Sequence, residues 1–362
     1  GPDAAGHARA LPLRHAPRLR ALIGGGGLLS LARAPPPAAP EDAMTAIAED
    51  ATPRPPVALD ELFRVFGRIG VLSFGGPAAQ IALMHRELVD DRPWLTEREY
   101  LSALSFCMLL PGPEAMQLAT YAGWKLRGTL GGLIAGGLFV LPGALVMLAL
   151  AAGYAAFGDV PLVDALFLGV KATVVVIVIQ ALLRIGARAL TATDFRLLAL
   201  LSFVAIFVFD LPFPLIIAAA AAYGAFGRPA DPAPPAPPGP APRLGDLART
   251  VAVWGALWLG PLAVLWASGA RFLTEVGLFF AKLAVVTFGG AYAVLAYMTQ
   301  EVVQDYGWLT TAGMMDGLGL AETTPGPLIL VTEFVGYLAG HGAGGVWLGL
   351  AAAGVTLWAT FL

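Results

Sequence analysis

The chain has 362 residues, of which 57% are hydrophobic and only 13% are charged, and its mean hydropathy is +0.74. A soluble domain carries about 25% charged residues, so this composition argues against a soluble protein. The net charge of −3 says little, because the positions of the charges matter more than their sum, and no nucleic-acid partner is expected. A single cysteine excludes an intramolecular disulfide, and the four histidines are scattered, so neither a metal site nor a cofactor is expected.

Several apolar runs are long enough to cross a bilayer, which takes about 20 helical residues. The clearest cover residues 130–157, 162–183, 197–226 and 250–270. Because these runs are continuously apolar rather than alternating, they predict helices and not the strands of a membrane barrel. The expected fold class is therefore an all-α integral membrane protein in a lipid bilayer.

Residues 1–58 differ in composition from the rest of the chain. They hold several arginines, a glycine run at 24–27 and proline clusters at 35–37 and 53–56. This pattern predicts a disordered tail. The alternatives are a tag remnant at Gly1-Pro2, or a wrongly assigned leader upstream of a natural start at Met44. A targeting peptide is less favoured, because no apolar core of about 7–15 residues with a cleavage site is present.

The first half, residues 59–226, contains two breaks within apolar sequence. Ser73-Phe74-Gly75-Gly76 ends one helix, and Pro77 suits the first turn of the next. Two short apolar pieces, 100–110 and 114–123, flank Pro111-Gly112-Pro113. Each would be about 15 Å long, half a bilayer, so they predict half-helices in either a re-entrant hairpin or a broken span. A further break at 210–214 leaves the number of spans open.

A proline-rich linker at 227–249 precedes a second half, residues 250–362, that repeats the first. Thr287-Phe288-Gly289-Gly290 and Pro325-Gly326-Pro327 match the first-half motifs at one common offset in the numbering, from 73 to 287 and from 111 to 325. We therefore predict two homologous repeats, and an odd span count in each would make them inverted. The second half has no counterpart of roughly 150–226, so we expect it to be truncated at its C-terminal end.

The paired breaks predict a binding site for a small oxyanion. A break inside a membrane is costly unless the freed polar groups face protein, water or a ligand. The helix that follows each break presents unpaired N–H groups and the positive end of its dipole, which suit an anion. The alternative is a set of packing kinks without a ligand. The candidate substrate-binding residues at the breaks are Ser73, Gly75, Gly76, Gly112, Pro113, Thr287, Gly289, Gly290, Gly326 and Pro327.

Two cations occupy matching places in the halves. Arg68 lies six residues before Phe74, and Lys282 lies six residues before Phe288. Intramembrane cations are expensive and usually line a polar cavity, so this pair is a candidate for neutralising a dianion. Snorkelling to the interface is the alternative. Lys171, in the run 162–183, is a third candidate, either for anion attraction or for a structural ion pair.

Carboxylates and neutral donors flank the proline motifs. Glu114, Glu322 and Glu333 are candidates for a coupling proton, or for ion pairs with Arg68 or Lys282. Glu114 also fits a role at the positive end of a helix. Four neutral side chains either ligate an anion or satisfy backbone groups: Gln80, Gln117, Thr323 and Thr324.

Taken together, the motifs resemble those of the chromate ion transporter family. The likeness covers about 59–362 and rests on five motifs: Phe74-Gly75-Gly76-Pro77, Trp94-Leu95, Pro111-Gly112-Pro113, Phe288-Gly289-Gly290 and Pro325-Gly326-Pro327. The resemblance implies a long-chain, two-domain protein of the bacterial inner membrane that exports chromate and confers chromate resistance. It also implies sulfate as a competing ligand. The early C-terminal end departs from the family pattern.

These observations predict a secondary transporter that moves chromate out of the cytoplasm, with no enzymatic activity. Each charge gains about 2.3 kcal/mol per 100 mV, so a dianion gains roughly 4.6 kcal/mol, or a roughly 2,000-fold concentration ratio. One rival is a carrier of sulfate or another oxyanion, and another is a channel. A membrane enzyme acting on a lipid phosphate would need a base, nucleophile or metal site, and none is evident. A homodimer is left open by the sequence.

Overall fold

The structure is a computed structural model that describes residues 57–158, 160, 190–209, 211, 213–227, 244–287 and 291–362, with isolated residues between 167 and 187. These residues belong to one compact unit, and their regular structure is entirely helical. The tail at 1–58 lies almost wholly outside the described residues, and the linker at 227–249 lies mostly outside them. So does part of the run 162–183.

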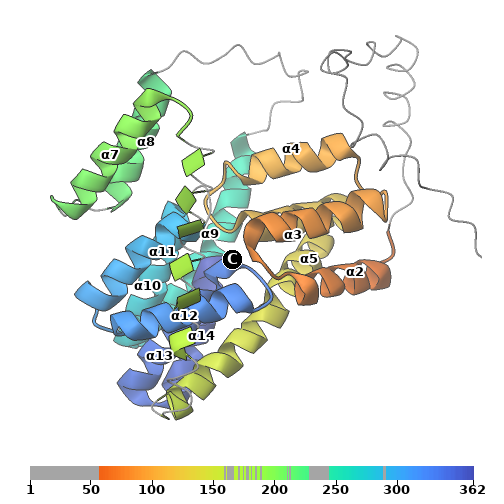
Figure 1. Cartoon of the computed structure of the whole chain (residues 1–362). Coiled ribbons are helices and arrows are strands. Elements are labelled where there is room, and N and C mark those ends of the chain that lie inside the picture. The colour runs from red at the N-terminus through yellow and green to blue at the C-terminus, as the bar shows by residue number, and fades with distance from the viewer. Residues whose placement is uncertain are drawn as a thin grey trace, which may run out of the picture. The chain divides into compact units, whose positions relative to one another are not determined.

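The first half begins with three short helices and one long helix (Figure 1). They are α2 (Leu59–Leu72), α3 (Gly76–His85), α4 (Glu97–Cys107) and α5 (Glu114–Phe157), with a π-helical turn at Arg86–Asp90 after α3. In α2, Leu62, Val65, Phe66 and Ile69 recur at helical spacing and are all buried. This apolar face packs against α5. The helices end at both glycine and proline motifs, between 72 and 76 and between 107 and 114.

Within α5 the chain reverses direction at Arg127 and Gly128, whose backbone angles are not helical. Gly128 has a φ of 62°, a left-handed conformation that glycine adopts without strain. The two arms then pack so closely that a Cβ on Gly123 would overlap the carbonyl of Gly131. The piece that starts at Glu114 is therefore the short arm of a helical hairpin, about 20 Å long.

The second half contains α9 (Leu244–Ala267), α10 (Arg271–Val286), α11 (Ala291–Gln300), α12 (Thr311–Thr323), α13 (Val331–Gly344) and α14 (Val346–Phe361). A π-helical turn at Glu301–Asp305 follows α11, and a 3₁₀ turn at Leu328–Leu330 precedes α13. α4 begins at Glu97 and α12 begins at Thr311, two positions that are related by the offset of the motifs. α13 and α14 also form a tight hairpin, in which a Cβ on Gly340 would be 2.8 Å from Ala352 Cβ.

The remaining described helices, α7 (Thr193–Phe207) and α8 (Phe213–Gly227), pack against each other. The Tyr223 hydroxyl on α8 donates a hydrogen bond of 3.0 Å to Asp194 Oδ2 on α7. The break predicted at 210–214 covers the end of the connection between these helices and the first two residues of α8, and residues 210 and 212 lie outside the described part of the chain.

The long arm of α5 connects two apolar cores. One core contains α2–α4 residues and α5 as far as Phe139, and the other contains α9–α14 residues and α5 from Ala144 onward. The Tyr154 hydroxyl near the end of α5 donates to Asp316 Oδ2 on α12 at 2.9 Å. Both halves are therefore fixed to one helix, and Gly143 lies where the two cores meet.

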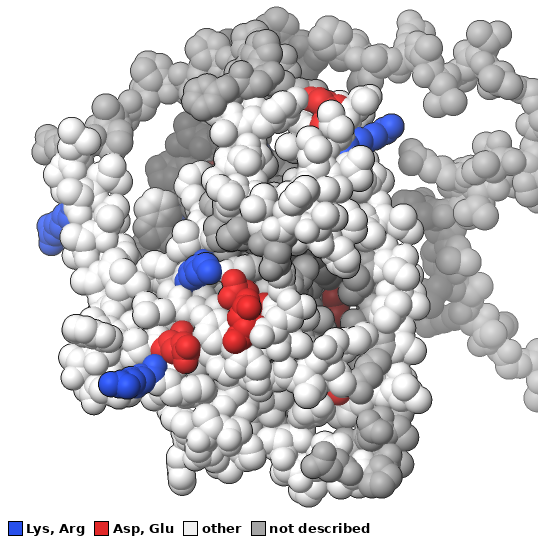
Figure 2. All heavy atoms as spheres, turned by 90° about the vertical axis from the view of Figure 1, so that its left-hand side faces the viewer, with Lys and Arg blue, Asp and Glu red and all other residues white. Residues whose placement is uncertain are grey.

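Two described helices, Glu114–Phe157 and Leu244–Ala267, are long and apolar enough to cross a membrane. Shorter apolar helices cover Leu215–Ala225, Leu328–Gly344 and Val346–Phe361. Figure 2 shows a face that is almost entirely uncharged, with its few Lys, Arg, Asp and Glu residues in small groups. An apolar surface of this kind suits contact with lipid acyl chains better than contact with water.

Candidate functional site

The glycine and proline breaks of the two halves bind to each other through backbone hydrogen bonds. The Gly112 amide donates to the Thr287 carbonyl at 2.7 Å, and the Gly326 amide donates to the Ser73 carbonyl at 2.9 Å. The repeat relates Gly112 to Gly326 and Ser73 to Thr287 by one common offset. The two bonds are therefore reciprocal, and each proline loop is held by the other half. We call these contacts the two crossings.

The backbone at the crossings requires glycine. Gly75, Gly112 and Gly326 have φ values of 85°, 114° and 90°, a region that side chains with a Cβ rarely adopt. Immediately after these residues, α3 starts at Gly76, α5 at Glu114 and the 3₁₀ turn at Leu328. The local sequence thus turns the chain sharply and starts a new helical segment in three of the four breaks. In the fourth break, Gly289 and Gly290 lie outside the described residues.

Two glutamine side chains reinforce the proline loops. Gln80 Nε2 donates to the Gly326 carbonyl at 2.7 Å and approaches the Ser73 carbonyl at 3.3 Å. Gln117 Nε2 donates to the Pro111 carbonyl at 2.6 Å. The amide nitrogens are thus used by backbone groups. Gln80 Oε1, Gln117 Oε1 and Ser73 Oγ are buried and have no hydrogen-bond partner among the described residues.

A cavity of about 20 Å³ lies at the crossings and is lined by residues from all four breaks. Its lining residues are Pro77, Gln80, Pro113, Glu114, Ala115, Thr287, Pro327, Leu328 and Ile329. The starts of α3 and α5 and the 3₁₀ turn before α13 therefore meet at one place, and each contributes the positive end of its backbone dipoles. The volume admits about one water molecule. A tetrahedral oxyanion, with a central atom and four oxygens, needs a larger space.

The two predicted cations lie apart from this cavity and are paired with carboxylates. Arg68 Nε is 3.6 Å from Glu87 Oε1, and Lys282 Nζ is 3.7 Å from Glu301 Oε1. Glu87, whose side chain is 2% exposed, also receives a 2.6 Å bond from Arg92. Glu87 and Glu301 are related by the same offset as the two cations, and that signal was available in the sequence. Lys282 lines a second cavity of about 650 Å³ along α10.

The other predicted residues are distributed around the crossings. Thr323 and Thr324 donate to backbone carbonyls of α12, at Gly319 and Leu320 and at Ala321 respectively. Glu322 lies half-buried at the end of the same helix. Glu333 is buried in α13, and its Oε2 has no hydrogen-bond partner in the part of the chain that the structure describes. Lys171 lies outside the described residues.

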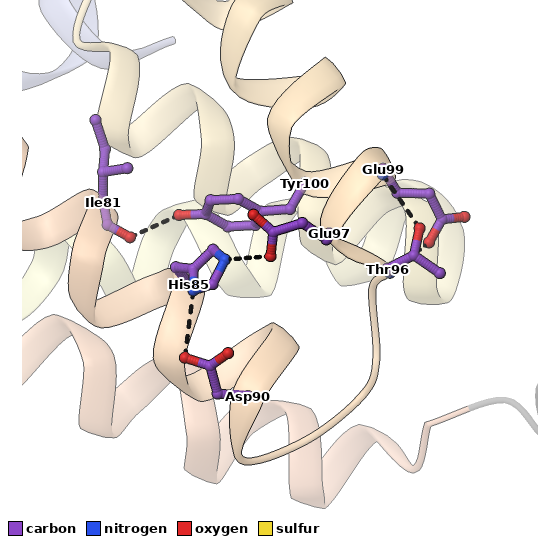
Figure 3. A network of polar contacts seen from close by, with 7 residues as sticks. All are labelled: Ile81, His85, Asp90, Thr96, Glu97, Glu99 and Tyr100. Atoms are coloured by element: carbon purple, nitrogen blue, oxygen red, sulfur yellow. Dashed lines mark hydrogen bonds and ion pairs between the residues drawn. The ribbon is translucent and has the colours of Figure 1, made fainter. Parts of the chain in front are cut away.

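A separate polar network surrounds His85 at the end of α3 (Figure 3). His85 Nε2 is 2.6 Å from Glu97 Oε2, and Nδ1 is 3.3 Å from Asp90 Oδ2. The hydrogen bond with Glu97 is the main cause that raises the pKa of the imidazole. An imidazole that contacts a carboxylate through each nitrogen donates to both only when it is protonated. This network joins α3, the π-helical turn and the start of α4.

These features define a helical membrane protein in which broken helices from both halves meet at one site. Residues 61–225 and 274–362, more than half of the chain, match the chromate transporter family. The chain belongs to the chromate transporter family. No solved structure matches it.

Three curated relatives cover most of the chain. It is 34% identical over 296 residues to a chromate transport protein of Pseudomonas aeruginosa, covering 81% of this chain and 69% of that protein. It is 31% identical over 309 residues to a chromate transport protein of Cupriavidus metallidurans, covering 85% and 72%. A probable chromate transport protein of Synechococcus elongatus is 30% identical over 287 residues, covering 78% and 70%.

Proposed function

We propose that this protein is a secondary transporter that exports chromate across the bacterial inner membrane and thereby confers chromate resistance. The observation that carries this proposal is the convergence of residues from four helix breaks on one cavity. Discontinuous helices whose N-termini point at an anion are a recurrent design of transporter sites. The named activity of the relatives supplies the substrate, because the geometry alone specifies an anion.

We further propose that the halves are inverted repeats of a multi-pass protein. The reciprocal bonds of Gly112 with Thr287 and of Gly326 with Ser73 support a two-fold relation between them. Inversion would place corresponding loops on opposite sides of the membrane. Single cysteines at Asp91 and at its counterpart Asp305, in a Cys107→Ser background, would test this. A thiol reagent that cannot cross the membrane should label the two positions from opposite sides, and labelling from the same side would refute inversion.

The cavity as described corresponds to a closed state of the transport cycle. Its volume of about 20 Å³ excludes a tetrahedral oxyanion, so substrate entry requires the crossings to separate. Separation breaks the two backbone bonds and the bond from Gln80 to Gly326. Each such bond contributes only about 0.5–1.5 kcal/mol net, so these three bonds by themselves oppose opening only weakly. Alternating separation on the two sides would give alternating access.

Arg68, Lys282 and Lys171 are proposed to attract the dianion on its way to the crossings. Both Arg68 and Lys282 are at least half exposed, and their distances to Glu87 and Glu301 are long for ion pairs. Weak pairing keeps an exposed cation available to a passing anion at little cost. Glu114, Glu322 and Glu333 are proposed as carboxylates that balance charge during the cycle.

The experiment is chromate uptake into inside-out membrane vesicles with and without an imposed lumen-positive potential. We expect uptake driven by the potential and inhibited by excess sulfate. An Arg68→Ala/Lys282→Ala variant should require a higher chromate concentration for half-maximal uptake, and Arg249→Ala on α9 is the matched control. Uptake no greater than in membranes without the protein would refute the proposal. Faster uptake of sulfate than of chromate would make it a general oxyanion carrier.

A further inference from the structure

The small cavity at the crossings is lined by polar side chains that offer oxygen atoms and by no basic side chain. Of the described residues that line it, Gln80, Glu114 and Thr287 bear polar side chains, and none is Lys, Arg or His. Glu114, the first residue of α5, is half-buried and forms no hydrogen bond or ion pair with another described residue. A carboxylate at this position repels an oxyanion, although the neighbouring helix starts attract one.

The hydrogen bonds of Gln80 and Thr287 leave oxygen atoms available in the same place. Gln80 is 1% exposed, and its amide nitrogen already donates to backbone carbonyls, so its unpartnered Oε1 is the available atom. The Thr287 hydroxyl donates to the Leu283 carbonyl at 2.7 Å, which leaves its lone pairs free to accept. Carboxylate, amide and hydroxyl oxygens are the ligands of hard cations.

The size and charge of the cavity specify the class of cation. A volume of about 20 Å³ suits one particle of the size of a water molecule. One carboxylate matches one positive charge, and the described residues hold no group of three His, Cys, Asp or Glu that would suit a divalent metal. In transporters with broken helices, unwound backbone carbonyls and helix C-terminal ends coordinate Na⁺. Here the side-chain oxygens would take that role, and the carboxylate charge has to outweigh the positive ends of the helix starts.

We propose that this cavity binds Na⁺ through Glu114, Gln80 Oε1 and Thr287 Oγ1, and that the bound Na⁺ raises the affinity of the crossings for the oxyanion. This proposal rests on the proposed transport function for its second part only. Na⁺ neutralises the Glu114 carboxylate and so removes its repulsion of the oxyanion. The positive ends at the starts of α3, α5 and the 3₁₀ turn then attract the oxyanion. The coupling is reciprocal: the factor by which Na⁺ raises the affinity for the oxyanion equals the factor by which the oxyanion raises the affinity for Na⁺.

The transport test compares chromate uptake in Na⁺ and in choline at equal ionic strength and potential. For the wild type, Na⁺ should lower the half-saturating chromate concentration about tenfold, which is within the usual range of coupling between sites. Glu114→Gln should behave as the Na⁺-saturated wild type in both media, because the neutral amide replaces a neutralised carboxylate. Glu275→Gln, a carboxylate on the separate α10 cavity, is the control and should keep the Na⁺ effect.

A binding test that needs no transport uses the melting temperature of the purified protein in NaCl and in choline chloride. Cys107, the single cysteine, is buried and therefore reports unfolding through a thiol-reactive dye. Na⁺ should raise the melting temperature of the wild type and of Glu275→Gln but not of Glu114→Gln. Equal melting temperatures in NaCl and choline chloride would overturn the proposal. An equal rise in melting temperature with KCl, or at lower pH without Na⁺, would also overturn it. An Na⁺ effect on melting without any chromate uptake would retain the cation site and refute the transport function.

Discussion

Replacing Gly143 by alanine tests the closeness of the two halves most directly. Gly143 is buried on α5 where the two apolar cores meet, and a Cβ there would overlap the Pro325 carbonyl and lie 2.6 Å from Leu330 Cδ1. The backbone at Pro325 belongs to the loop that Gly326 ties to Ser73. The loop therefore has to move to admit one methyl group.

The magnitude follows from three terms. Overpacking costs about 1–3 kcal/mol, and strain on the bond between Gly326 and Ser73 costs up to about 1.5 kcal/mol. Alanine recovers about 1 kcal/mol through its higher helix propensity. The net loss is about 2 kcal/mol, which corresponds to a fall of about 3 °C in melting temperature for a chain of this size. Gly137 provides the control, because it is exposed on the same helix with nothing within 4 Å of a Cβ.

The assay is thermal unfolding in detergent, followed through exposure of Cys107 to a thiol-reactive dye. Gly143→Ala should melt about 3 °C below the wild type, and Gly137→Ala should melt at or slightly above it. The opposite signs separate a steric clash from a general effect of alanine in this helix. If Gly143→Ala melted at or above the wild type, the close approach of the Pro325 loop to α5 would be refuted.

Two further predictions concern ion pairs. Glu97 raises the pKa of His85 in the folded state, so protonated His85 stabilises the fold. This stabilisation is complete below the unfolded-state pKa of about 6.5 and is lost as the pH rises through the higher folded-state pKa. His85→Gln should therefore lower the melting temperature more at about pH 6 than at about pH 9. Equal losses at both pH values would contradict it. Arg92→Gln should cost about 2–3 kcal/mol, because it leaves the buried Glu87 with one distant partner, whereas Arg68→Gln should cost less than about 1 kcal/mol. Chemical denaturation of both variants measures the two costs, and a greater loss for Arg68→Gln would contradict this assignment of partners.

Local chemistry explains why the breaks could be predicted from the sequence. Glycine at a positive φ and proline at a helix start act within a few residues, so Gly75, Gly112 and Gly326 indicated their turns without tertiary information. The short length of the piece that starts at Glu114 was also predicted from its local run, but the reversal at Arg127 and Gly128 that makes it one arm of a hairpin was not. The all-helical class followed from composition in the same way.

Pairing between distant segments is what the sequence did not determine. The backbone carbonyls of Ser73 and Thr287 could each have accepted a hydrogen bond from a residue of their own half. Only the approach of the two halves brings the Gly112 amide to the Thr287 carbonyl. The partners of Arg68 and Lys282 illustrate an intermediate case. Glu87 and Glu301 keep the same offset as the cations, but a shared offset does not show that two side chains meet.

The two proline motifs differ in the residue that follows them, and this difference organises the electrostatics of the crossings. Glu114 begins α5 after the first motif, whereas Leu328 holds the equivalent place after the second. A carboxylate at a helix start offsets the positive end of the dipole, and leucine leaves that end intact. By the dipole argument, the start after the second motif would favour an anion, and the start after the first would do so only with Glu114 neutralised. Under the proposed Na⁺ binding, the two loops would differ in their attraction for an oxyanion until the cation neutralised Glu114.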